Sequence, residues 1–148
     1  MRAECVLRSS HECAAEMGHG YVGSEHILLG LLREQEGNVP KLLASFGITA
    51  KDVRAKICER TGMGNAAKNT VQGLTPCARR IIKSAYDVAH SSGASVIGTE
   101  HLLLGILIEE GSVAKKIMLQ INADMEKLRS KLEAEQPEIM LLVNNAGC

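Results

Sequence analysis

Apolar and small residues recur along this chain at the three- and four-residue spacing of an amphipathic helix. In residues 2–17 these positions are Ala3, Val6, Leu7, Ser10, Ala14 and Met17. Residues 76–92 repeat the pattern, and a glycine follows each stretch as a helix end. Nearly continuous apolar runs come next, at 27–32 and 102–108, and they predict the most buried helix of each half.

The two halves are an internal repeat with an offset of 75 residues. Residues 23–32 have the sequence GSEHILLGLL and residues 98–107 have GTEHLLLGIL, so seven of ten positions are identical. The other three exchange serine for threonine or isoleucine for leucine. One supersecondary unit therefore occurs twice, and this repeat governs both the fold and the search for a site.

Helix-start signals divide each half into four helices. Thr75 followed by Pro76 is a strong start, and Ser24 and Thr99 are predicted N-caps of the second helix in each half. Third helices are expected at 38–46 and 112–120, and fourth helices after Thr49 and Asn122. The resulting prediction is an all-α protein with a first repeat at 1–60, a linker at 61–74, a second repeat at 75–134 and a C-terminal tail at 135–148.

Composition narrows the function classes. With 17 basic and 17 acidic residues the net charge is zero, so the basic stripe of a nucleic-acid binder is missing. Five cysteines without a CxxC pair favour a reduced, cytoplasmic setting. No signal peptide or membrane-length apolar run is found, and no P-loop motif occurs, so neither a membrane partner nor a cofactor is expected. Because each half offers the other its apolar face, we expect the isolated domain to be a monomer.

The repeated acids are the strongest candidates for chemistry. His26 and His101 are interpreted as structural residues with local hydrogen bonds, and neither they nor the cysteines form a metal set. Glu25 and Glu100 lie in the first turn of equivalent helices, where the helix dipole favours an acid. A carboxylate there can also hold a guanidinium, and a helix start such as the one after Thr75 can hold an anion. Together these groups suit a ligand with both guanidinium and phosphate character.

The doubled G-[ST]-E-H-[IL]-L-L-G-[LI]-L motif and the Thr75-Pro76-x-Ala78-Arg79 helix start resemble the Clp N-terminal repeat domain. This is the N-domain of the Clp ATPases, AAA+ unfoldases that feed the ClpP peptidase. The resemblance covers about residues 2–133 and is nearest to the ClpC branch. It implies two tandem four-helix repeats packed as a pseudo-twofold helical bundle. It also implies a non-catalytic role, docking adaptor proteins and protein substrates for the host Clp ATPase and ClpP machinery.

The resemblance further implies recognition of phosphorylated arginine as a degradation mark. Glu25 and Glu100 would hold the guanidinium, and Thr75 would help to hold the phosphate. The chain starts too late to include the matching first-repeat threonine, and Cys77 replaces a residue that is often charged in the family. These departures favour the second-repeat site. The alternative function is a stand-alone accessory or scaffold protein of this fold that does not recognise phospho-arginine. A small Cys- or His-dependent hydrolase is a third hypothesis.

Overall fold

The computed structural model describes all residues except 1, 35–36, 63, 65–69 and 136–148. The described part contains eight helices and two strands of two residues each. The first repeat comprises α1 (Arg2–Glu16), α2 (Ser24–Arg33), α3 (Val39–Ser45) and α4 (Ala50–Thr61). The second comprises α5 (Pro76–Ser91), α6 (Thr99–Ile108), α7 (Val113–Gln120) and α8 (Met125–Glu135). The prediction of an all-α protein with two four-helix repeats is confirmed.

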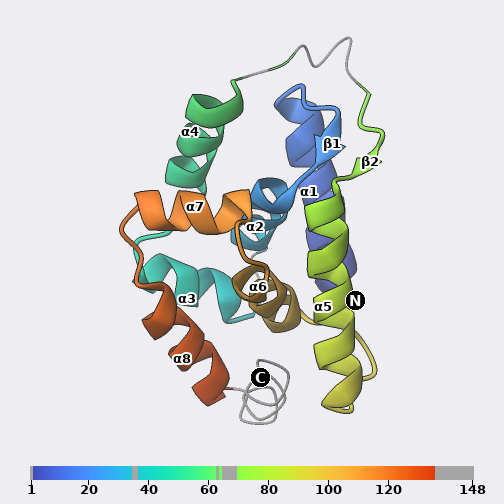
Figure 1. Ribbon diagram of the computed structural model, residues 1–148, viewed down its shortest axis with the longest axis vertical. Coiled ribbons are helices and arrows are strands. Elements are labelled where there is room, and N and C mark those ends of the chain that lie inside the picture. The colour runs from blue at the N-terminus through green and yellow to red at the C-terminus, as the bar shows by residue number, and fades with distance from the viewer. Residues whose placement is uncertain (1, 35–36, 63, 65–69, 136–148) are drawn as a thin grey trace.

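The helices pack with an approximate twofold symmetry that exchanges the two repeats. The central pair, α2 and α6, contact each other, with α1 and α5 along one side and the shorter helices on the other (Figure 1). The contacts also come in matched sets: α1 touches α6 as α5 touches α2, and α3 touches α6 as α7 touches α2. This correspondence confirms the pseudo-twofold bundle.

The two repeats share one hydrophobic core. Its largest fully buried side chains come mostly from the central helices, and they include Leu28, Leu29, Leu103 and Leu104. The core is aliphatic because the chain has so few aromatic residues. Within the described ranges, no helix combines the length and the apolar character that crossing a membrane requires.

A close helix crossing explains the second glycine of the repeated motif. A Cβ atom on Gly30 would lie 2.7 Å from the Val6 carbonyl oxygen of α1, and one on Gly105 would lie 2.6 Å from the Ile81 carbonyl oxygen of α5. Both distances are shorter than non-bonded carbon and oxygen atoms tolerate. Glycine is therefore needed at each crossing for the first and second helices of the repeat to approach.

Two short strands connect the repeats at one end of the bundle. β1 (Tyr21–Val22) pairs in parallel with β2 (Gly73–Leu74), which lies inside the stretch predicted to be a linker. The Thr75 N–H then donates to the Val22 carbonyl at 2.9 Å. This pairing fixes the start of α5 beside the start of α2. The predicted tail falls, apart from Glu135, outside the described residues, and the predicted domain boundaries stay a prediction.

Candidate functional site

Each central helix begins at the glycine of the repeated motif. The N-caps are Gly23 and Gly98, so the prediction of Ser24 and Thr99 as N-caps is wrong. The reason is the histidine three residues on: the Gly23 N–H donates to His26 Nδ1 at 2.9 Å, and the Gly98 N–H donates to His101 Nδ1 at 2.8 Å. The prediction that both histidines make local hydrogen bonds is confirmed.

The hydroxyl groups of Ser24 and Thr99, which do not cap the helices, make different contacts in the two repeats. Ser24 Oγ accepts a hydrogen bond from the Ala114 N–H at 3.1 Å, which links α2 to the start of α7. Thr99 is fully buried, and its hydroxyl has no partner in the described part of the chain. The two motifs are therefore alike in backbone geometry and different in what their second residue contacts.

The first glycine of the motif makes room for the acid. The Glu25 carboxylate folds back over Gly23, so that any Cβ at this position would collide with Glu25 Oε1. A Cβ on Gly98 would likewise lie 2.9 Å from Glu100 Oε2. Glycine, acid and histidine thus act as one unit, which holds a carboxylate at the helix start in both repeats.

The threonine predicted for the site lies with the first-repeat acid. Thr75 is the N-cap of α5, and its Oγ1 accepts from the Ala78 N–H at 3.1 Å. Cys77, two residues further on, has its thiol pKa raised by burial, and both the hydroxyl of Ser24 and the charge of Glu25 act on it. The structure thus brings Thr75 to the first-repeat motif, and the binding roles of Glu25, Glu100 and Thr75 stay predictions. The site at the α2 start contains residues from both repeats.

Burial and nearby polar groups act on the Glu25 carboxyl in opposite directions. Burial raises the pKa of its carboxyl, while its own backbone N–H and the charges of His19 and Arg60 act in the opposite direction. His26 Nδ1 lies 3.3 Å from Glu25 Oε1. The pair is not ionic at neutral pH, because burial lowers the pKa of His26 to about 4 and its Nδ1 already accepts from Gly23. Among the described residues, no strong ion pair therefore neutralises the Glu25 carboxylate.

The Glu25 side chain is 12% exposed, so only a small part of it is accessible to a ligand. Glu100 is more open, being half-buried. Its neighbour His101 has a pKa lowered by burial, with Glu100 acting to raise it. The two acids consequently form two unequal sites, one enclosed and one open.

A chain of hydrogen bonds supports the enclosed site. His19 Nδ1 lies 2.8 Å from His26 Nε2, and His19 Nε2 lies 2.8 Å from the Gly62 carbonyl oxygen at the end of α4. Because the Gly23 N–H must donate to His26 Nδ1, the proton of His26 is on Nε2 and points to His19. His19 in turn donates to Gly62. All three hydrogen bonds, from Gly23 to His26, from His26 to His19 and from His19 to Gly62, can form together only when both histidines are neutral.

Comparison with known proteins identifies the family. The model of the Clp repeat (R) N-terminal domain matches residues 1–107 and 73–143. The chain is 35% identical over 131 residues to the chaperone protein ClpB of Oceanobacillus iheyensis, and to the same extent to the negative regulator of genetic competence ClpC/MecB of Bacillus subtilis. Each alignment covers 88% of this chain and 16% of the relative. The chain thus spans only a small part of these proteins.

Solved structures show the same fold. The N-terminal domain of ClpD from Arabidopsis thaliana superimposes with a TM-score of 0.72 at 19% identity, covering 90% of this chain and 94% of that one. A complex of the ClpV N-domain with a VipB peptide gives 0.63 at 16% identity, with 88% and 82% coverage. The motif, the duplicated helix starts and the sequence match agree, and the chain belongs to the Clp repeat N-terminal domain family.

Proposed function

We propose that this chain is a non-catalytic docking domain that presents adaptor proteins and protein substrates to a Clp-type ATPase. Membership of the Clp N-terminal domain family supports the proposal. The structure of the ClpV N-domain was solved with a bound VipB peptide, which is an example of peptide docking on the same fold. We place the chain with ClpC-type unfoldases that work with ClpP in the cytoplasm.

We further propose that the ligand of the Glu25 site is phosphorylated arginine. The main observation in support is that the Glu25 carboxylate, which has no strong ion-pair partner among the described residues, lies beside the capped start of a 16-residue helix. A guanidinium can make paired hydrogen bonds to the carboxylate. Its phosphate can then meet the Thr75 hydroxyl and the first-turn N–H of Cys77, where the helix dipole favours an anion. Glu100 provides a second, more open site for the guanidinium.

The closing experiment is a calorimetric titration of free phospho-arginine into the chain, with arginine and inorganic phosphate as control ligands. We expect saturable binding of phospho-arginine only, with Glu25→Gln and Glu100→Gln each removing one site. Asp87→Asn, at an exposed position of α5, is the matched control and should change nothing.

The pairing of Thr75 with Glu25 has its own test. Thr75→Asp preserves an N-cap acceptor but repels a phosphate. In a Glu100→Gln background, where only the Glu25 site remains, it should abolish binding. In a Glu25→Gln background it should leave the Glu100 site intact. The opposite result would assign Thr75 to the second-repeat acid.

A scaffold that docks partners without recognising phospho-arginine is the second candidate. The enclosure of Glu25, whose side chain is 12% exposed, favours it. This candidate would be selected if the wild-type titration showed no heat of phospho-arginine binding and the same chain captured a protein partner.

A further inference from the structure

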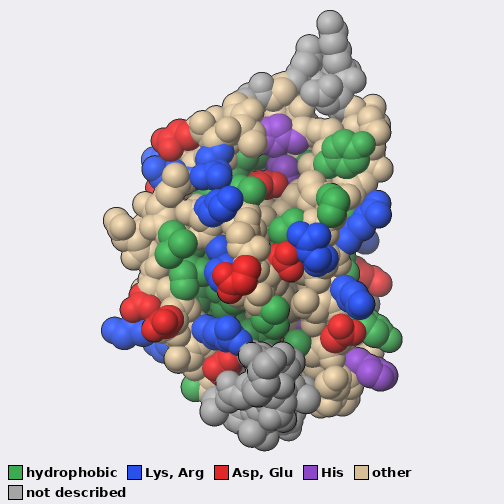
Figure 2. Space-filling model, viewed as in Figure 1, with side chains coloured by type: hydrophobic (Ala, Val, Ile, Leu, Met, Phe, Trp, Pro, Cys, Tyr) green, Lys and Arg blue, Asp and Glu red, His purple; other side chains and the backbone are tan. Residues whose placement is uncertain are grey.

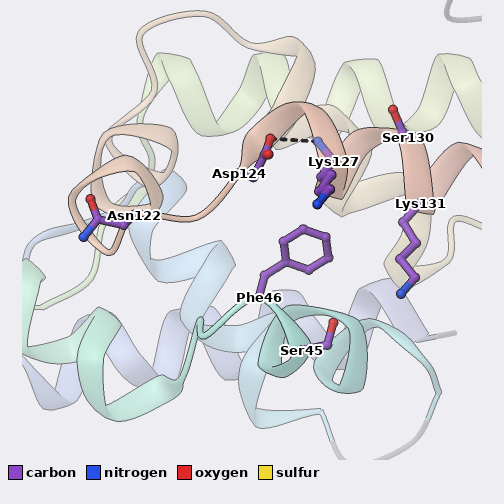
Figure 3. Close-up of a pocket in the computed structure, with 7 residues that line it drawn as sticks. All are labelled: Ser45, Phe46, Asn122, Asp124, Lys127, Ser130 and Lys131. Atoms are coloured by element: carbon purple, nitrogen blue, oxygen red, sulfur yellow. Dashed lines mark hydrogen bonds between the residues drawn. The ribbon is translucent and has the colours of Figure 1, made fainter.

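A pocket of about 770 Å³ lies between the end of α3 and the start of α8, and neither Glu25 nor Glu100 lines it (Figure 3). One wall is Phe46, which follows the last turn of α3 and is the only phenylalanine of the chain. The opposite wall carries Lys127 and Lys131 of α8. The pocket therefore exists only because the two repeats pack together, since α3 belongs to the first and α8 to the second.

The apolar part of this pocket is a half-buried aromatic ring. Phe46 packs against the edge of the core without being sealed by it, and its ring points into the pocket between the two helices (Figure 3). The equivalent residue of the second repeat is Ile121, so the ring is particular to one half. Ring faces of this kind accept an aliphatic or aromatic side chain from a ligand.

The polar part of the pocket is cationic. Lys127 and Lys131 are exposed, four residues apart on one helix face, and neither forms an ion pair with another described residue. Like charges at this spacing destabilise a helix slightly, and a bound anion would relieve that repulsion. In the first repeat the matching positions are Asp52 and Lys56, so the positive pair is also confined to one half.

Two described acids near these lysines make other contacts. The Asp124 Oδ1 atom accepts a hydrogen bond from the Lys127 backbone N–H at 3.0 Å, which uses this carboxylate as a helix cap. Glu133 of α8 pairs instead with Arg129 at 3.1 Å. Elsewhere on the face shown in Figure 2, basic and acidic side chains are interspersed. A ring flanked by two ammonium groups that pair with no other described residue is thus a local concentration of apolar and positive character.

We propose that this pocket docks an acidic segment of a partner protein, with an apolar side chain against Phe46 and flanking carboxylates on Lys127 and Lys131. We choose an acidic partner because of charge complementarity. Lys127 and Lys131, four residues apart on α8, can pair with acidic residues on either side of one apolar residue. This site goes beyond the proposed phospho-arginine site, since it uses neither Glu25 nor Glu100. It would give the domain a second means of holding a partner.

The test uses the full chain and a fluorescein-labelled nine-residue peptide that has one leucine between two pairs of glutamates. Fluorescence anisotropy should show saturable binding that weakens as salt increases. A peptide with glutamine for glutamate, and one with serine for leucine, should each bind at least tenfold more weakly. Equal binding of either control peptide would overturn the proposal.

Charge reversal locates the site. Lys127→Glu combined with Lys131→Glu should weaken binding at least tenfold, whereas Lys83→Glu with Lys116→Glu, at exposed positions outside the pocket, should change it less than threefold. In ¹⁵N-labelled protein the peptide should shift the amide signals of residues 45–46 and 124–131. Shifts confined to residues 23–26 and 75–78, or an equal loss in both double variants, would overturn the assignment.

Other occupants would be visible in the same assays. Displacement of the peptide by inorganic phosphate at equal concentration would show a simple anion site, and peptide-independent dimerisation abolished by the α8 variant would show a second copy of this chain. Either outcome overturns the proposal. Phospho-arginine titration of the α8 variant should be unchanged, so failure here is distinct from failure of the Glu25 site.

Discussion

Acid should weaken the fold through the histidine chain at the start of α2. His26 is 2% exposed, and burial lowers its pKa from 6.5 to about 4. The perturbation is a change of pH from 7.5 to 4.0. Protonation of either histidine breaks this hydrogen-bond chain. A proton on His26 Nδ1 would face the Gly23 N–H, and a proton on His19 Nδ1 would face the N–H of His26 Nε2.

The sign follows from proton binding in the two states. Between pH 6.5 and about 4, unfolded His26 binds a proton that the folded residue does not, so stability falls as the pH falls. The His26 contribution is therefore complete above pH 6.5 and lost as the pH decreases through the folded pKa. A difference of 2.5 pKa units corresponds to about 3 kcal/mol, or a decrease of about 6–12 °C in Tm for a domain of this size.

The measurement is the Tm by circular dichroism at half-unit pH steps, in wild type and two variants. His26→Asn retains a hydrogen-bond acceptor near the position of Nδ1, but asparagine does not ionise. The Tm of this variant should therefore depend less on pH than the Tm of the wild type between pH 6.5 and 4. His19→Ala copies the second repeat, which has Ala94 at this position. This variant should raise the pKa of His26 toward 6.5. The pH range over which the His26 contribution to stability is lost should therefore become narrower.

Comparison between variants is needed because other groups titrate in the same range. The pKa of Glu25 is raised mainly by burial, so acid favours its folded form and opposes the His26 effect. The pKa of Glu16 is lowered, first by its hydrogen bond with Arg33, so acid weakens that contribution. A wild-type pH profile parallel to that of His26→Asn between pH 6.5 and 4 would refute the reasoning.

Three further predictions concern the repeated motif. Leu103→Ala should lower the free energy of unfolding by about 2–5 kcal/mol in urea titrations, because it opens a cavity at a fully buried position. A near-neutral result would show that α6 is not at the core. Gly105→Ala should cost about 1–3 kcal/mol by pushing α6 from the Ile81 carbonyl. Gly20→Ala, where a Cβ meets nothing within 4 Å, is its control in the same titrations. Glu100→Ala should remove one phospho-arginine site in calorimetry yet change stability by at most about 1 kcal/mol; unfolding of this variant would make Glu100 a structural residue.

The sequence by itself determined the repeat, the helix count and the core. Apolar spacing and local start signals are properties of neighbouring residues, so Thr75 with Pro76 marked α5 correctly, and the leucine runs marked the two central helices. The family resemblance also followed from local motifs. These features depend on contacts within one or two helical turns, which a single sequence displays directly.

Only the tertiary structure decided which groups share a site. Thr75 lies beside the first-repeat motif because the pairing of β1 with β2 carries the start of α5 to that repeat. Strands of two residues have no sequence periodicity by which they can be recognised. The prediction of Ser24 and Thr99 as N-caps was wrong for a related reason. Ser24 and Thr99 have the chemistry of a cap, but the histidine at the third helical position takes the free N–H, and the Ser24 hydroxyl bonds to the second repeat 90 residues away.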